Sequence, residues 1–249
     1  SGQNAVTELW YGGVGSVRNS ISRYIVKFPL EELASKFYSG EIMSGSVKSY
    51  KLKMKNAIPS DITLETDFKF DRLSKVISTS FDLITFPINK YWDEGRGYDL
   101  IEEDFLVRQS GNPLVSGFSN WDYSTSVIPW DEPGVYTNPT ASTISGLSST
   151  QHFDLGNEDL EMDITNLVNA WLSGSVENHG IGVAYRRDFE LMSTNTRSIA
   201  SFFANKTNSA FKPFIEIDYD QTIIDDREQV SNNRTNRLFL YTFSGNTNA

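Results

Sequence analysis

The stretch that decides the fold is Ser49-Tyr-Lys-Leu-Lys-Met-Lys55, in which apolar and charged side chains alternate without a break. Successive side chains of an extended strand point to opposite faces of the sheet, so a period of two places Tyr50, Leu52 and Met54 on one face and the lysines on the other. The pattern predicts a strand with one face in a core and one face in water.

Similar short runs recur along most of the chain, and each is read as a strand. They are Arg23–Phe28, Ile62–Phe70, Ile181–Tyr185, Ser198–Phe203 and Pro213–Tyr219. Aromatic residues make up 13% of the 249 residues, which also favours pleated, half-buried surfaces. We therefore expect an all-β fold of antiparallel strands packed as a sandwich.

Two segments have the period of a helix instead. Pro29–Phe37 has Pro at its start, acidic residues in its first turn and Lys36 near its end, as the helix dipole favours. In Asp163–Gly174 the apolar side chains fall on one helical face, and Gly174 is placed to end the helix. We expect short helices only here, with Trp171 buried on the apolar face of the second.

The chain divides into a large domain, residues 1–220, and a different C-terminal segment, residues 221–249. After Tyr219 the sequence becomes polar and rich in Asn, and it then runs into the apolar, β-prone segment Arg237–Phe243. An isolated strand that is apolar on both faces needs a partner. We expect Arg237–Phe243 to pair with a following domain or with a neighbouring subunit.

Charge and cysteine content exclude several functions. The formal net charge is -10, so a phosphate backbone and an anionic membrane would both be repelled, and we expect neither nucleic acid nor membrane as a partner. Cysteine is absent, which excludes disulfides and thiolate chemistry. With only two histidines, a three-histidine zinc site is excluded as well. No catalytic constellation emerges, and we expect that the chain is not an enzyme.

Several short motifs, taken in order, resemble the DNRLRE family of β-sandwich modules, although the hexapeptide behind that name is absent. The motifs are Leu9–Gly13 followed by Arg23–Phe28, Val47–Met54, Tyr91–Gly97, Asn120-Trp121, Met162–Gly174 followed by Asn178–Val183, Ser201–Ala204 and Lys212–Tyr219. The resemblance covers about residues 5–220. It implies a jelly-roll related to alginate-type carbohydrate-binding modules, with a virion or extracellular location.

The irregular segment from Gly111 to Ser149 is the main candidate for a binding surface, because it carries several large aromatic residues in an ordered loop. Trp130 stands between two prolines and is the candidate for an exposed ring that stacks on a sugar, with Tyr123 and Tyr136 beside it. In the family pattern Trp92, Trp121 and Trp171 occupy core positions. We therefore expect those three rings to be structural.

Acidic residues suggest a calcium site. Asp93, Glu94 and Asp99 supply the hard oxygen ligands that Ca²⁺ prefers, although EF-hand spacing is absent. A second group contains Asp154, Glu158, Asp159 and Asp163. The alternative is a solvated acidic rim, with Asp163 near a helix N-terminus.

Three functions are compatible with these features. The first is a non-catalytic structural or adhesion module of a phage virion or similar surface assembly, attached through residues 237–243, and this is the function we expect. The second is a carbohydrate-binding module of a secreted polysaccharide-degrading protein. The third is one domain of such an enzyme, with the catalytic part elsewhere. A cell-surface glycan is a candidate ligand in the first two.

Overall fold

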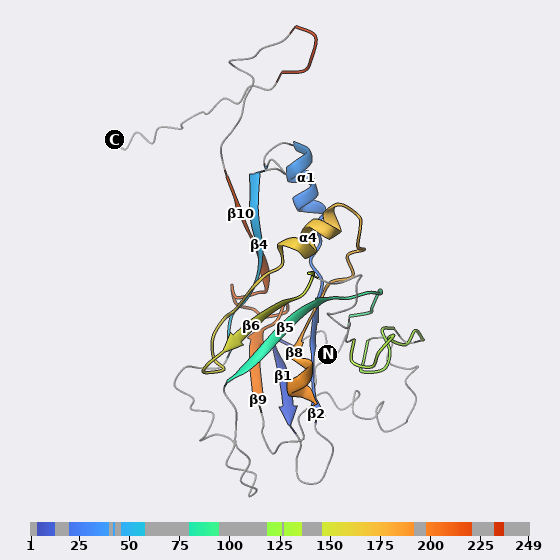
Figure 1. Cartoon of the computed structure of the whole chain (residues 1–249), viewed down its shortest axis with the longest axis vertical. Coiled ribbons are helices and arrows are strands. Elements are labelled where there is room, and N and C mark those ends of the chain that lie inside the picture. The colour runs from blue at the N-terminus through green and yellow to red at the C-terminus, as the bar shows by residue number, and fades with distance from the viewer. Residues whose placement is uncertain are drawn as a thin grey trace, which may run out of the picture.

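The computed structural model describes residues 4–12, 20–39, 42, 46–57, 80–94, 119–125, 127–135, 146–191, 198–220 and 232–236 (Figure 1). The expected strand at Ile62–Phe70 and the run Arg237–Phe243 lie outside these ranges.

The described part of the chain is built mainly of strands in three antiparallel sheets. The strands are β1 (Val6–Gly12), β2 (Ser20–Ile21), β3 (Tyr24–Val26), β4 (Val47–Met54), β5 (Phe81–Pro87), β6 (Ser149–Phe153), β7 (Leu160–Asp163), β8 (Ile181–Tyr185), β9 (Ser198–Phe203) and β10 (Phe214–Tyr219). The sheet orders are β2-β1-β9, β10-β4-β7 and β3-β8-β5-β6. The expected all-β, antiparallel character is confirmed.

Strand β4 has the two faces that its alternating sequence predicts. Tyr50, Leu52 and Met54 are buried, whereas the side chains of Lys51 and Lys53 lie on the other face and pair with Glu161 of β7. β4 is the central strand of its sheet. The alternation in its sequence reflects one face packed in the core and one face in solvent.

The chain continues beyond β4 and joins two of the sheets. The amide of Phe203 donates to the carbonyl of Lys55 at 3.0 Å, and the amide of Ala57 donates to the carbonyl of Ser201 at 2.9 Å. These hydrogen bonds connect the end of β4 with β9. The β10-β4-β7 and β2-β1-β9 sheets are therefore linked through the backbone.

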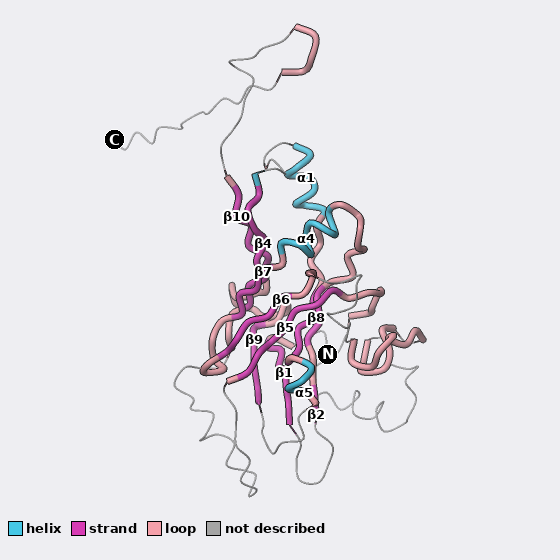
Figure 2. Tube along the Cα trace, viewed as in Figure 1, coloured by secondary structure: helices cyan, strands magenta, loops and turns pink. Residues whose placement is uncertain are grey.

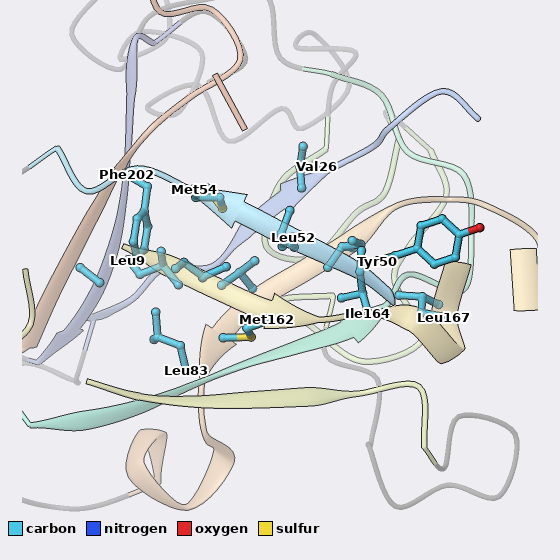
Figure 3. Close-up of a cluster of buried hydrophobic side chains, with 14 of the residues drawn as sticks. Leu9, Val26, Tyr50, Leu52, Met54, Leu83, Met162, Ile164, Leu167 and Phe202 are labelled. Carbon is cyan, nitrogen blue, oxygen red and sulfur yellow. The ribbon is translucent and has the colours of Figure 1, made fainter. Parts of the chain in front are cut away.

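All three sheets contribute to one core. Leu9 of β1, Leu52 of β4, Leu83 of β5, Met162 of β7 and Phe202 of β9 belong to a single cluster of buried side chains (Figure 3). Burial of so many apolar side chains in one cluster is the main source of stability for such a fold.

Within the described ranges, three helices accompany the sheets (Figure 2). Helices α1 (Glu31–Ser39) and α4 (Thr165–Leu172) lie where the sequence predicts them. In α4 the indole of Trp171 is buried, as expected, with 7% of the residue exposed. The single-turn helix α5 (Arg187–Glu190) was not expected, because four residues are too few to show a helical period.

None of the helices in the described ranges has the length and apolar character that crossing a bilayer requires.

Candidate functional site

The four-stranded sheet is covered on both of its faces. Phe81 and Leu83 of β5 point into the shared core, whereas Ile84 and Phe86 point the other way, into a second and smaller cluster. That cluster is completed by Ile88, Ala184, Val135 and Trp130. The second cover explains why β5 shows no alternation in its sequence.

The cover comes from residues 119–125 and 127–135, here called the aromatic loop, which is green in Figure 1. Trp130 is only 6% exposed, and its indole N–H donates to the carbonyl of Asn120 at 2.8 Å. Its backbone amide donates to the carbonyl of Asp122 at 2.9 Å. The expectation of an exposed Trp130 ring is wrong, because the ring fills the second cluster and its polar atom is used inside the loop.

The exposed tryptophan of this loop is Trp121 instead. With 41% of the residue exposed, it is not the core residue that the family pattern implied. The guanidinium carbon of Arg23 lies 4.9 Å from the centre of its ring, a cation–π contact. The carbonyl of Trp121 also accepts a hydrogen bond of 2.6 Å from the amide of Gly134.

Gly134 allows the loop to pass close to the Trp121 ring. Its φ of 80° is in the left-handed region, and a β-carbon there would lie 2.7 Å from two ring carbons of Trp121. Any side chain at this position would push the ring away. The next residue, Val135, has φ of 63°, a conformation that a β-branched residue adopts only at an energetic cost.

Arg23 is itself held by a buried ion pair. Its Nε donates to Glu190 Oε1 at 3.0 Å and its Nη2 donates to Glu190 Oε2 at 2.5 Å, while its Nη1 donates to the carbonyl of Gly134 at 2.7 Å. The exposed fractions of the two side chains are 4% and 1%. We call Arg23, Glu190, Gly134 and Trp121 the clasp, since together they connect the start of β3, helix α5 and the aromatic loop.

Short-range hydrogen bonds fix the loop on the other side of Trp121. The side-chain oxygen of Asn120 accepts from the amides of Asp122 and Tyr123 at 2.9 and 3.0 Å, which closes a tight turn around Trp121. Tyr123 forms a β-bridge with Pro129 and is half-buried. The predicted ligand residues Tyr123 and Trp130 therefore share one loop, and Tyr136 lies outside the described residues.

Carboxylates surround this loop. Asp122, Asp131 and Glu132 are exposed. The ammonium group of Lys90 lies 2.5 Å from Asp131, and this contact, supported by Asn89, holds the pKa of the Asp131 carboxyl below its ordinary value. Asp131 therefore stays negatively charged under mildly acidic conditions.

The acids expected to bind calcium do not converge in the described ranges, where no group of three acidic or histidine side chains could hold a metal ion. Asp93 joins loops through its backbone, which bonds to Ser124 and Ser119. Glu94 lies 3.7 Å from the ammonium of Lys206. Asp99 lies outside the described residues.

The second acidic group has structural partners. Asp163 accepts from the amide of Thr165 at 2.8 Å and so begins helix α4, and Asp159 pairs with Lys55 at 2.5 Å. Glu158 accepts from the amides of Asp154 and Leu155. The alternative placed Asp163 near a helix N-terminus, and it does lie there, whereas Glu158 and Asp159 have partners of their own and do not form a simple solvated rim.

One cluster, beside the start of β5 and on the edge strand β6, has a serine, a histidine and an aspartate in the same sequence of contacts as a catalytic triad. His152 Nε2 lies 3.3 Å from Ser80 Oγ, and His152 Nδ1 lies 2.6 Å from Asp82 Oδ1. The hydrogen bond with Asp82 raises the pKa of His152, and Asp154 lies 3.4 Å from Nε2. Asp82 also pairs with Arg186 at 2.8 Å, so these side chains form an exposed charge network across neighbouring strands.

Comparisons with protein-family models, with curated proteins and with solved structures found no match for this chain. The likeness to the DNRLRE modules thus stays a prediction from the sequence motifs.

Proposed function

We propose that the chain is a non-catalytic structural or adhesion module of a phage virion or similar extracellular surface assembly, with its strands arranged as a jelly-roll β-sandwich. The clasp is the observation that carries this proposal. A bidentate ion pair between two almost fully buried side chains is used to hold an aromatic ring at the surface. An aromatic ring held at the surface in this way suits a surface whose role is contact with another molecule.

Attachment through the C-terminal segment is the second part of the proposal. In the described ranges β10 pairs with β4 alone and is an edge strand, and none of its side chains is fully buried. Figure 1 shows β10 running with β4 toward α1, away from the aromatic loop. The described chain therefore leaves the sheets at the end that lies toward α1. In this proposal residues 237–243 pair with a neighbouring protein in the assembly.

A carbohydrate-binding module of a secreted polysaccharide-degrading protein is the second candidate. The exposure of Trp121 favours it, because flat aromatic rings at a surface suit the apolar faces of sugars. The two candidates differ in what residues 221–249 do, since a binding module in a modular enzyme needs them only as a connection.

Truncation after Asp220 tests the attachment. We expect the full chain to associate with itself or with its assembly partner, and the truncated chain to be folded and monomeric in size-exclusion chromatography with light scattering. A matched control keeps the full length but replaces Leu238, Leu240 and Tyr241 with Ser, and we expect it to behave as the truncated chain does. Unfolding of the truncated chain, or a self-associating control, would contradict the proposal.

A further inference from the structure

We infer that Trp121 is a stacking platform for an uncharged hexopyranose unit of a polysaccharide, and that Arg23 is the positioning residue that holds its ring. This inference rests on the proposed surface role and adds to it the chemical class of the ligand.

The ring is fixed before any ligand arrives. Asn120 closes the turn on one side of Trp121, Gly134 binds its carbonyl on the other, and Arg23 lies against its face. Arg23 is in turn fixed by Glu190 and by the carbonyl of Gly134. A side chain that is already ordered loses little conformational entropy on binding, so more of the contact energy remains as affinity.

The exposure of Trp121 contrasts with that of other tryptophans in the fold. Trp130 and Trp171 are 6% and 7% exposed, whereas Trp121 is 41% exposed although Arg23 and Gly134 cover part of its ring. Leaving a large apolar ring in water forgoes the stabilisation that burial gives. A ring that is both rigid and exposed is the arrangement that suits a flat ligand with an apolar face.

Exposed acids of the aromatic loop bear on the choice of ligand. Asp122 and Glu132 are exposed on the same loop as Trp121, and Asp131 is exposed as well, with its carboxylate paired with Lys90. Carboxylates accept hydrogen bonds from sugar hydroxyls, and they repel uronate or sulfate groups. An uncharged sugar therefore fits this surface better than an acidic one.

Val127 and Ile128 of the same loop are also exposed, which allows a sugar ligand to be distinguished from a protein ligand. A protein partner would use these aliphatic side chains together with Trp121, since protein interfaces have contiguous apolar centres. A sugar that stacks on Trp121 does not need them. The variants Val127→Ser and Ile128→Ser thus distinguish the two kinds of ligand.

The experiment measures binding of the full chain to an array of neutral hexasaccharides of glucose, galactose and mannose, followed by calorimetric titration of those that bind. We expect at least one glycan to bind, and Trp121→Ala to weaken its binding about tenfold or more, as loss of an aromatic anchor does. Trp121→Phe should retain part of the affinity. Tyr38→Ala is the matched control, because Tyr38 is 94% exposed and belongs to α1, which lies away from the aromatic loop in Figure 1. This variant should bind as the unchanged chain does.

Four outcomes would overturn the inference: no neutral glycan bound by the intact chain, unchanged binding in Trp121→Ala, tighter binding of an acidic polysaccharide such as alginate, or equal losses in the Val127 and Ile128 variants. Circular dichroism melts of every variant exclude misfolding as the cause of a loss. The truncation after Asp220 should leave glycan binding intact, so failure of the attachment and failure of this site give different results.

Discussion

Arg23 and Glu190 form a two-point ion pair in which both side chains are almost fully buried, although the residues are 167 positions apart in the chain. The pair joins α5 to the start of β3. Arg23 of this pair lies against the ring of the exposed Trp121.

Breaking this pair on one side should be costly. We expect Arg23→Met to lower the free energy of unfolding by about 3–5 kcal/mol, because the Glu190 carboxylate is then buried without its partner. The double variant Arg23→Met with Glu190→Leu should be closer to the original stability. Urea denaturation of the single and double variants gives the coupling energy, and an additive result would show that the two side chains do not depend on each other.

Truncation of Trp171 should test the docking of α4. Replacing this buried ring with Ala should cost about 3–5 kcal/mol, as is usual for large-to-small changes in a core. Its indole N–H is buried without a hydrogen-bond partner in the described part of the chain, so Trp171→Phe removes an unsatisfied donor along with some contacts. We expect the Phe variant to lose much less stability than the Ala variant. Equal losses in thermal melts would contradict this.

The ion pairs on the solvated face of β4 should make the stability of the protein depend on pH in the acidic range. Hydrogen bonds from Lys51 and Lys53 lower the pKa of Glu161 from 4.5 to about 2. A lowered pKa in the folded state stabilises the protein above the unfolded value of 4.5, and this contribution is lost as the pH falls toward 2. The difference in melting temperature between the unchanged chain and Glu161→Gln should therefore shrink between pH 5 and pH 2. A constant difference would show that the ion pairs of Glu161 with Lys51 and Lys53 are not formed in solution.

The charge network at His152 should act in the opposite direction. Its hydrogen bond with Asp82 raises the pKa of His152 above 6.5, so the contribution is complete below that pH and is lost as the pH rises through the folded pKa. The melting temperature of His152→Gln should thus differ from that of the unchanged chain more at pH 5.5 than at pH 8.5. NMR titration of the imidazole measures the pKa directly, and a value at or below 6.5 would refute the raised pKa.

Short β-prone runs in the sequence predicted β4, which has one solvated face, and also β8 and β9, whose residues are almost all buried. Alternation in β4 is visible because Lys51 and Lys53 stay in water opposite Leu52 and Met54. β5 could not be found in this way, since the shared core covers one face and the aromatic loop covers the other. The residues that cover β5 are distant from it in sequence, so the sequence of β5 alone does not predict that both of its faces are buried.

The candidate site shows the same limit more sharply. Two prolines beside Trp130 suggested a protruding ring, yet the bridge between Tyr123 and Pro129 folds that segment back onto the sheet. Trp121, by contrast, is exposed because Arg23 supports it from a distant strand. The sequence could locate the loop, while the exposure of each ring depends on tertiary contacts.

The pairing of β1 with β9 has a consequence for synthesis. Val6 lies opposite Phe203, so β1 can pair with β2 early but gains its longer pairing, with β9, only when almost all of the described fold has been translated. At about 5–20 residues per second, the N-terminal strand waits on the order of 10–40 s outside the ribosome with Leu9 and Tyr11 uncovered. Production of this protein should therefore depend on holdase chaperones during translation, and slow translation at low temperature should lengthen the interval in which nascent chains can aggregate.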